Sequence, residues 1–109
     1  MLVAQEVATQ LIRSLRGPVA AVESQDKALA DQLRRAGTSV LLNVAEAKKR
    51  VGKDRAHLFR IAAGSAEEVR AALTVATGWG YITDESVAHT LELLDRELAL
   101  LWGLTRHKG

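Results

Sequence analysis

Residues 27–50 read KALADQLRRAGTSVLLNVAEAKKR, and this stretch decides the fold that the sequence predicts. Its apolar residues recur at steps of four and three, which is the spacing of one face of an α-helix. The stripe consists of Leu29, Leu33, Ala36, Val40, Val44 and Ala47. We expect this helix to end among Lys48, Lys49 and Arg50, where cations stabilise the negative end of the helix dipole, with Gly52 supplying the cap.

A first helix is expected before this stretch, from about Leu2 to Val22. It contains Pro18, which cannot donate a backbone hydrogen bond. Because the apolar period continues past the proline, we favour one kinked helix over two separate helices. Ser24 or Asp26 then offers an N-cap for the helix quoted above.

Two more helices are expected after it. The third begins near Asp54, a plausible N-cap, and stops at the turn 78–80, which the indole of Trp79 can plug. Its expected stripe is Leu58, Ala62, Ser65, Val69, Ala72 and Ala76. The fourth begins at Thr83 or Asp84, and its stripe is Val87, Leu91, Leu94, Leu98 and Leu101. Four amphipathic helices with short connections predict an all-α, antiparallel up-and-down four-helix bundle, with residues 1–109 as a single domain.

Composition agrees with a helical core and narrows the function. Of the 109 residues 48% are hydrophobic but only 4% are aromatic, which favours closely packed helices built on Leu and Ala over a β-sandwich. The chain has no Cys, which excludes disulfides, thiolate metal sites and a cysteine nucleophile. Neither a signal peptide nor an apolar run of ~20 residues is present, so we expect a cytoplasmic protein that does not enter a membrane.

The second and fourth helices carry more apolar surface than one bundle can bury. Residues 40–47 and 91–104 are apolar on most sides, broken in the first case by Asn43 and Glu46. A helix that is apolar on most sides is buried on most sides. We therefore expect the chain to associate with itself, as a closed symmetric ring or a dimer.

A cluster of cations is the sharpest charge feature. Six lie within thirteen positions: Lys48, Lys49, Arg50, Lys53, Arg55 and Arg60. Arg34 and Arg35 precede them by about four helical turns, roughly 21 Å along the axis, and are expected to project in similar directions. One interpretation is a phosphate-binding strip. The other is a solvated helix end and loop, which is the commoner role of charge runs.

No residue pattern indicates catalysis. Asn43 and Glu46 lie one turn apart on an apolar stretch, and we interpret them as a structural polar pair, satisfied by Ser39, Ser65 or an arginine. Glu46 as a general base lacks an evident partner. The chain also lacks the paired Glu-x-x-His motifs that hold metals in helical bundles. We expect no enzyme activity, metal or cofactor.

Several motifs together resemble a bacterial family, the four-helix-bundle proteins encoded in 23S rRNA intervening sequences. They are Gln32-Leu33-Arg34-Arg35-Ala36, Ser39-Val40, Asn43-Val44-Ala45-Glu46, Leu58-Phe59, Ala62-Ala63-Gly64-Ser65-Ala66-Glu67-Glu68-Val69 and Trp79-Gly80-Tyr81. The resemblance covers roughly residues 29–81. One departure is Ala47, where the family usually has Gly, and it puts the geometry of the following loop in doubt.

The resemblance implies a ring-shaped homo-oligomer, commonly a pentamer. It also implies kinship with the accessory variability protein of diversity-generating retroelements, which is similar to a basic ring that engages a reverse transcriptase and nucleic acid. On this basis we expect a non-enzymatic scaffold associated with RNA, DNA or a nucleic-acid-bound protein such as a reverse transcriptase. The alternative is an oligomeric protein–protein adaptor without nucleic-acid binding, in which the same cations meet an acidic partner.

Overall fold

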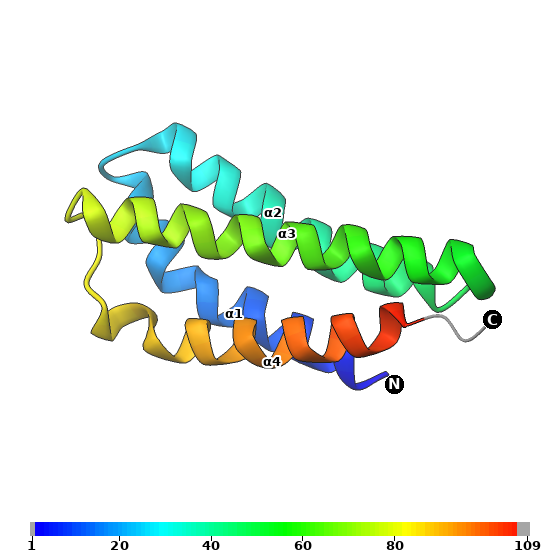
Figure 1. Ribbon diagram of the computed structural model, residues 1–109. Helices are drawn as coiled ribbons and strands as arrows, with labels where there is room; N and C mark the ends of the chain where they lie inside the picture. The colour runs from blue at the N-terminus through cyan, green and yellow to red at the C-terminus, as the bar shows by residue number, and fades with distance from the viewer. Residues whose placement is uncertain (1, 107–109) are drawn as a thin grey trace.

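The computed structural model describes residues 2–106 and is entirely helical. Its elements are α1 (Val3–Glu23), α2 (Lys27–Ala47), α3 (Gly52–Gly78), a short 3-10 helix η1 (Glu85–Val87) and α4 (Ala88–Thr105). The chain reverses direction at each connection, and each helix packs against its neighbours in the sequence, with α4 closing the bundle against α1 (Figure 1). The predicted all-α up-and-down bundle is confirmed.

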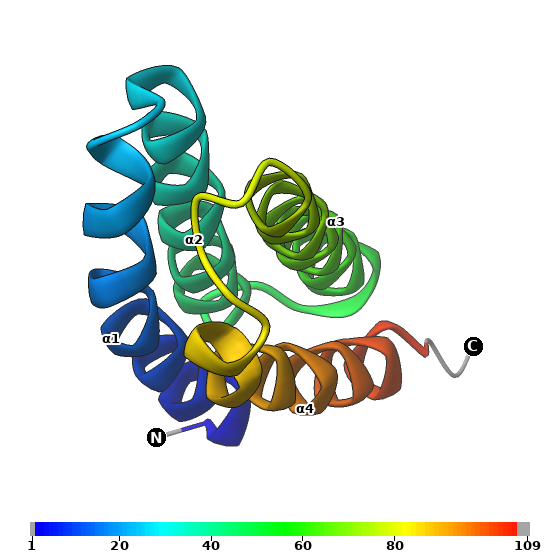
Figure 2. The same ribbon diagram turned by 90° about the vertical axis from the view of Figure 1, so that its left-hand side faces the viewer.

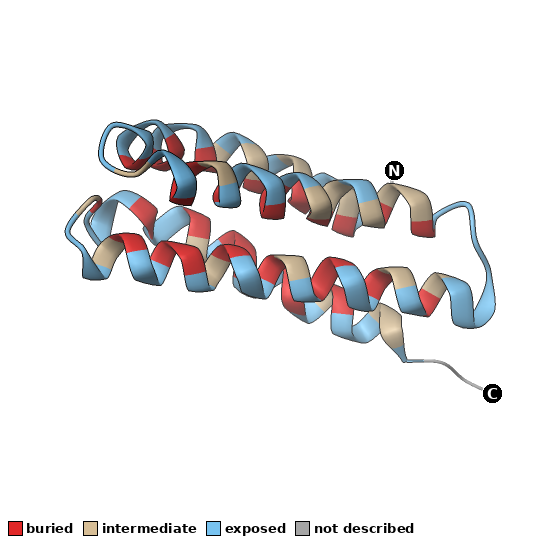
Figure 3. Cartoon of the chain, turned by 90° about the horizontal axis from the view of Figure 1, so that it is seen from above, coloured by how far each residue is buried: buried red, intermediate tan, exposed pale blue. Residues whose placement is uncertain are grey.

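The core consists mainly of Ala, Val and Leu side chains from all four helices. In Figure 3 the buried residues lie on the sides of the helices that face one another. The whole stripe predicted for α2 is buried. On α3, however, Leu58 and Ser65 remain partly exposed, and the buried face turns toward Ala63, Ala66 and Leu73. Six alanines are buried along α3, and Phe59 of the same helix is the largest fully buried side chain. Small side chains let neighbouring helices approach α3 closely, so its stability depends on close packing of many small groups and not on a few large ones.

Pro18 lies inside α1, which continues to Glu23 as one helix, so the expectation of one helix and not two is confirmed. The proline leaves the Ser14 carbonyl without its usual donor. The hydroxyl of Thr90 on α4 lies 3.3 Å from that carbonyl oxygen and 2.9 Å from the Ser14 Oγ. A side chain from another helix therefore takes the place of the missing backbone donor.

The helix starts follow the predictions in part. Asp26 is the N-cap of α2, and its carboxylate accepts from the Leu29 N–H at 3.0 Å. Asp54 is not the N-cap of α3. That helix begins two residues earlier, after Val51, because Gly52 adopts the left-handed φ of +61° that turns the chain. Asp54 lies within the first turn.

The connection from α3 to α4 crosses one end of the bundle (Figure 2). Trp79 does not plug this turn, since its side chain is 72% exposed. Backbone bonds close the turn instead: the N–H of Trp79 donates to Val75 and that of Tyr81 donates to Ala76, both at 2.9 Å. Neither Thr83 nor Asp84 starts α4: Asp84 is the N-cap of η1, beside which Thr83 Oγ1 accepts from the Ser86 N–H at 3.2 Å, and α4 starts only at Ala88.

On α4 the buried face is shifted from the predicted stripe. Leu91 is only partly buried, whereas Thr90, Leu93 and Glu97 join the core. Within the described residues, no helix is long and apolar enough to span a membrane.

Candidate nucleic-acid interface

The α2–α3 connection gathers cations at one end of the bundle. This basic end consists of Lys48, Lys49, Arg50, Lys53 and Arg55. Lys48 is the C-cap of α2, so the first three side chains surround the negative end of that helix. The other two lie in the first turn of α3, which follows Gly52 directly. All five are exposed except Arg55, which is partly buried.

Three of the five cations are engaged within the chain. The Lys48 Nζ donates to Gln5 Oε1 of α1 at 2.9 Å, which ties the start of α1 to the end of α2. Arg50 pairs with Glu46 at 3.1 Å, and the Arg55 guanidinium lies 5.5 Å from the centre of the Phe59 ring. Within residues 2–106, Lys49 and Lys53 make no salt bridge or side-chain hydrogen bond. These two are the free charges of the basic end.

The start of α3 adds a second source of positive potential. Its N-cap, Val51, has no side chain that can accept from the first-turn N–H groups. Free N–H groups and the positive end of the helix dipole attract anions. Asp54 offsets part of this effect, since it is the acidic residue of that turn.

Arg34, Arg35 and Arg60 are not part of the basic end. Arg60 lies eight residues after Gly52 on α3, about 12 Å along the axis, and Arg34 and Arg35 are roughly 21 Å from Lys48 by the same rise per residue. Arg34 pairs with Glu23 at 2.7 Å and with Asp31 at 3.0 Å. The hydrogen bond to Glu23 is the main cause that raises the pKa of Arg34. The eight predicted cations therefore fall into three places: the basic end, Arg60 further along α3, and Arg34 with Arg35 further back on α2.

Asn43 and Glu46 do not form a pair with each other. The Asn43 amide donates to the carbonyl of Ser39 at 2.9 Å and to its hydroxyl at 3.0 Å, and that hydroxyl lies 2.7 Å from the Ser65 Oγ. Glu46 is directed to Arg50 at the surface. The prediction of structural roles, with Ser39, Ser65 and an arginine as partners, fits these contacts, but the two residues serve different networks.

Glu97 is a core residue that was not predicted. Its side chain is fully buried on α4, and neither carboxylate oxygen has a hydrogen-bond partner. Burial raises the pKa of Glu97 from 4.5 to about 8, against a smaller opposing effect of the Arg96 charge. The available signal was its position, three residues after Leu94 and four before Leu101, on the core face of the helix.

The residues described form no group of three or more His, Asp or Glu side chains placed to hold a metal ion. The surface presents the basic end, two exposed apolar side chains on neighbouring helices, Leu42 of α2 and Ile61 of α3, and a hollow between α1 and α2.

Comparison with known proteins identifies the lineage of this fold. Residues 4–103 match the family model of the 23S rRNA-intervening sequence protein. The chain belongs to this family. Among solved structures it is similar to a protein of unknown function from the S23 ribosomal protein family of Bacteroides thetaiotaomicron, with a TM-score of 0.85 and 20% identity over 94% of this chain and 98% of that one. No curated protein matches the chain.

Membership of the 23S rRNA-intervening sequence family accounts for the predicted resemblance, and the structural neighbour supports the bundle architecture in nearly its full length. At 20% identity the neighbour speaks for the fold alone.

Proposed function

We propose that the protein is a non-enzymatic, homo-oligomeric scaffold that contacts the phosphate groups of nucleic acid, alone or in a ribonucleoprotein, through the basic end. The observation that carries this proposal is the placement of Lys49 and Lys53, exposed and without an ion pair in residues 2–106, beside the uncapped start of α3. Each cation that neutralises a phosphate releases counterions and so adds affinity without sequence specificity.

Self-association is supported by exposed apolar side chains on α2 and α3. Leu42 is 62% exposed and Ile61 is 40% exposed. The contact between Ser39 and Ser65 sets these antiparallel helices in register, so that Leu42 and Ile61 lie at nearly the same height. An apolar α2–α3 face of this kind suits a contact between copies, and a pentameric ring would place several basic ends side by side.

The binding experiment compares matched pairs of neutralised cations. Fluorescence anisotropy with a structured RNA and with a duplex DNA is recorded from 50 to 300 mM salt for wild type, Lys49→Gln/Lys53→Gln and the control Arg13→Gln/Arg96→Gln. For wild type we expect affinity that falls steeply with salt. The first variant should bind more weakly at every salt concentration, with a log–log slope reduced by up to about 2, since each phosphate contact contributes ~0.9.

The control variant removes the same charge from exposed positions on α1 and α4 and should keep the wild-type slope. An equal loss in both variants would reduce the effect to net charge and contradict the assignment of the basic end. Absence of binding by wild type at 50 mM salt would favour the adaptor function, in which the cations meet an acidic protein.

Assembly is tested separately by light scattering. Wild type should exceed the mass of one chain at micromolar concentration, and Leu42→Glu should reduce it, because a charge within an apolar contact must be desolvated. Gln32→Glu, an exposed position on the same helix, is the matched control. A monomeric wild type would contradict the oligomer.

A further inference from the structure

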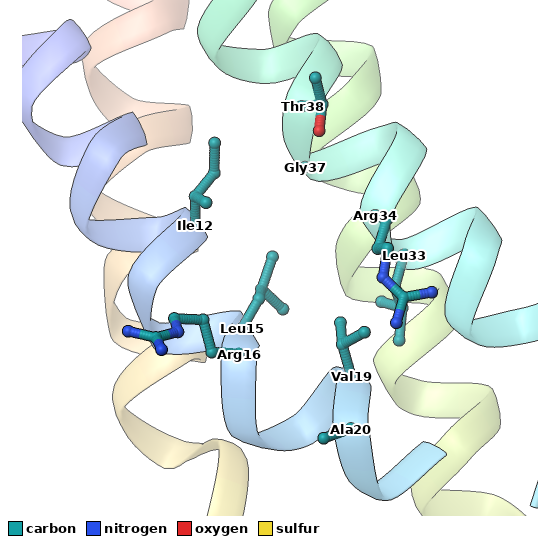
Figure 4. A pocket seen from close by; sticks show the side chains of 9 residues that line it. All are labelled: Ile12, Leu15, Arg16, Val19, Ala20, Leu33, Arg34, Gly37 and Thr38. Carbon is teal, nitrogen blue, oxygen red and sulfur yellow. The ribbon is translucent and has the colours of Figure 1, made fainter. Parts of the chain in front are cut away.

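A pocket lies between α1 and α2, away from the basic end (Figure 4). Its volume is about 370 Å³, within the usual range of small-molecule sites. The walls are mainly aliphatic, from Ile12, Leu15 and Val19 on α1 and Leu33 on α2. The pocket can therefore take an apolar group.

Two small residues keep the pocket open. Gly37 of α2 presents no side chain to it, and a Cβ at that position would come within 3.1 Å of Leu15 Cδ1. Ala20 of α1 lies at the other end of the pocket and is exposed (Figure 4). A larger side chain at either position would occupy the space.

A second, more open hollow adjoins the first, and the two share Arg34 and Thr38. It adds Asp31, Arg35, Ser39, Leu42 and Asn43 to the lining. Arg34 therefore stands between an apolar pocket and a polar, basic hollow. In Figure 4 its guanidinium lies beside Leu33 and above Val19, whereas the Arg16 side chain extends away from α2.

The ion pairs of Arg34 orient its guanidinium but leave some of its N–H donors unused. Glu23 and Asp31 each accept one of its five N–H donors, at 2.7 and 3.0 Å, so three remain. Asp31 also accepts from Lys27 at 2.9 Å, and this bond is the main cause that lowers the pKa of the carboxyl group. The acids are thus matched by Arg34 and Lys27, while Arg35 makes no salt bridge within residues 2–106. A net positive charge is left over at the hollow.

We propose that the two hollows together bind an amphipathic carboxylate of the medium-chain fatty acid class. The alkyl chain fills the pocket beside Leu15, Val19 and Leu33. The carboxylate lies in the adjoining hollow, where Arg34 and Arg35 supply charge-assisted donors and the Thr38 hydroxyl supplies a third. The site shares no residue with the basic end and is therefore independent of the proposed nucleic-acid binding, but its polar hollow shares Leu42 with the proposed contact between copies.

The first experiment is calorimetric titration of the whole protein with octanoate. We expect a dissociation constant in the submillimolar range. Octylamine, with the same chain and the opposite charge, should bind at least tenfold more weakly. Butanoate should bind on the order of a hundredfold more weakly, because four buried methylene groups are lost. Equal binding of octylamine would overturn the proposal, as would the absence of heat with octanoate.

Three variants place the ligand. Ala20→Leu narrows the pocket from an exposed position and should weaken octanoate binding at least tenfold, with the same melting temperature as wild type. Arg35→Gln should weaken octanoate but leave octan-1-ol unaffected, because the alcohol has no charge to pair. Arg13→Gln, which lines neither hollow, should bind as wild type does. Unchanged affinity in Ala20→Leu, or an altered assembly mass in that variant, would overturn the proposal, the latter by showing that a second copy occupies the pocket.

Discussion

Thr90 and Glu97 lie two turns apart on the same buried face of α4, and their polar groups are treated in opposite ways. Thr90 is 2% exposed and reaches Ser14 on α1 with its only donor. Glu97 is equally buried, but both of its carboxylate oxygens lack a partner. Thr90 donates toward a carbonyl of α1 that has lost its backbone donor, whereas Glu97 places in the core a carboxyl group without a hydrogen-bond partner.

The difference shows that burial alone does not decide what a polar side chain costs. The buried Thr90 hydroxyl needs an acceptor, and the Ser14 carbonyl lacks a donor because Pro18 has no N–H. Their contact satisfies both groups. A carboxyl without partners can enter the same core only by keeping its proton, which is why its pKa rises. Thr90 therefore stabilises the bundle at any pH, whereas the effect of Glu97 depends on pH.

The largest expected effect is a pH-dependent loss of stability caused by Glu97. The unfolded chain releases this proton near pH 4.5, but the folded protein keeps it until about pH 8. Between these values the folded state binds more protons, so its free energy of unfolding falls as the pH rises, by about 5 kcal/mol across the window, and levels off above pH 8. Urea denaturation of wild type and Glu97→Gln at pH 5, 6.5 and 8 measures the difference.

Glu92→Gln is the control, because Glu92 is exposed on the same helix. Its unfolding curves should follow those of wild type at every pH. Parallel curves for wild type and Glu97→Gln would show that the carboxyl of Glu97 finds a partner in solution. Glu97→Leu should be more stable than wild type at pH 8 by at least about 2 kcal/mol, since it removes an unsatisfied buried group.

A smaller effect is expected at Thr90, and it should depend on the proline. Thr90→Val keeps the shape but leaves the Ser14 carbonyl without a donor, at a cost of about 1 to 2 kcal/mol. In a Pro18→Ala background the backbone N–H of residue 18 can donate to that carbonyl, so the same substitution should cost less. A double-mutant cycle by thermal and urea unfolding would give a coupling of about 0.5 to 1 kcal/mol. A coupling near zero would show that the hydroxyl does not replace the missing backbone bond.

Neither the contact of Thr90 nor the burial of Glu97 was predicted from the sequence, whereas other features were. The stripe of α2 was predictable because its apolar residues recur at steps of three and four along the helix. The N-cap was predicted only as Ser24 or Asp26, and the structure has Asp26. On α3 alanine occurs on several faces, so the contrast between core and surface is weak and the predicted stripe included Leu58 and Ser65, which the structure leaves partly exposed.

Partners from other helices could not be predicted from spacing. Residues 48–55 stay together because they are consecutive, so the basic end followed from the sequence. The pairing of Arg34 with Glu23 joins two helices and needs the angle between them. Glu97 occupied a core position in the helical period, but its chemistry argued for the surface, and only the packed structure decides between the two.

The smallest effect is expected at the contact between Ser39 and Ser65, which is intermediate between the two cases on α4. Its oxygens lie 2.7 Å apart, and Asn43 supplies a second donor to the Ser39 hydroxyl, so Ser39 keeps a partner when the Ser65 hydroxyl is removed. Both serines are only partly buried, and Ser65→Ala should cost about 0.5 kcal/mol in urea unfolding, close to Ser24→Ala at an exposed helix end. The contact borders Leu42, on the face proposed to meet a second copy. A loss that rises well above this value with protein concentration would show that assembly buries the pair, and would move it into the class of Thr90.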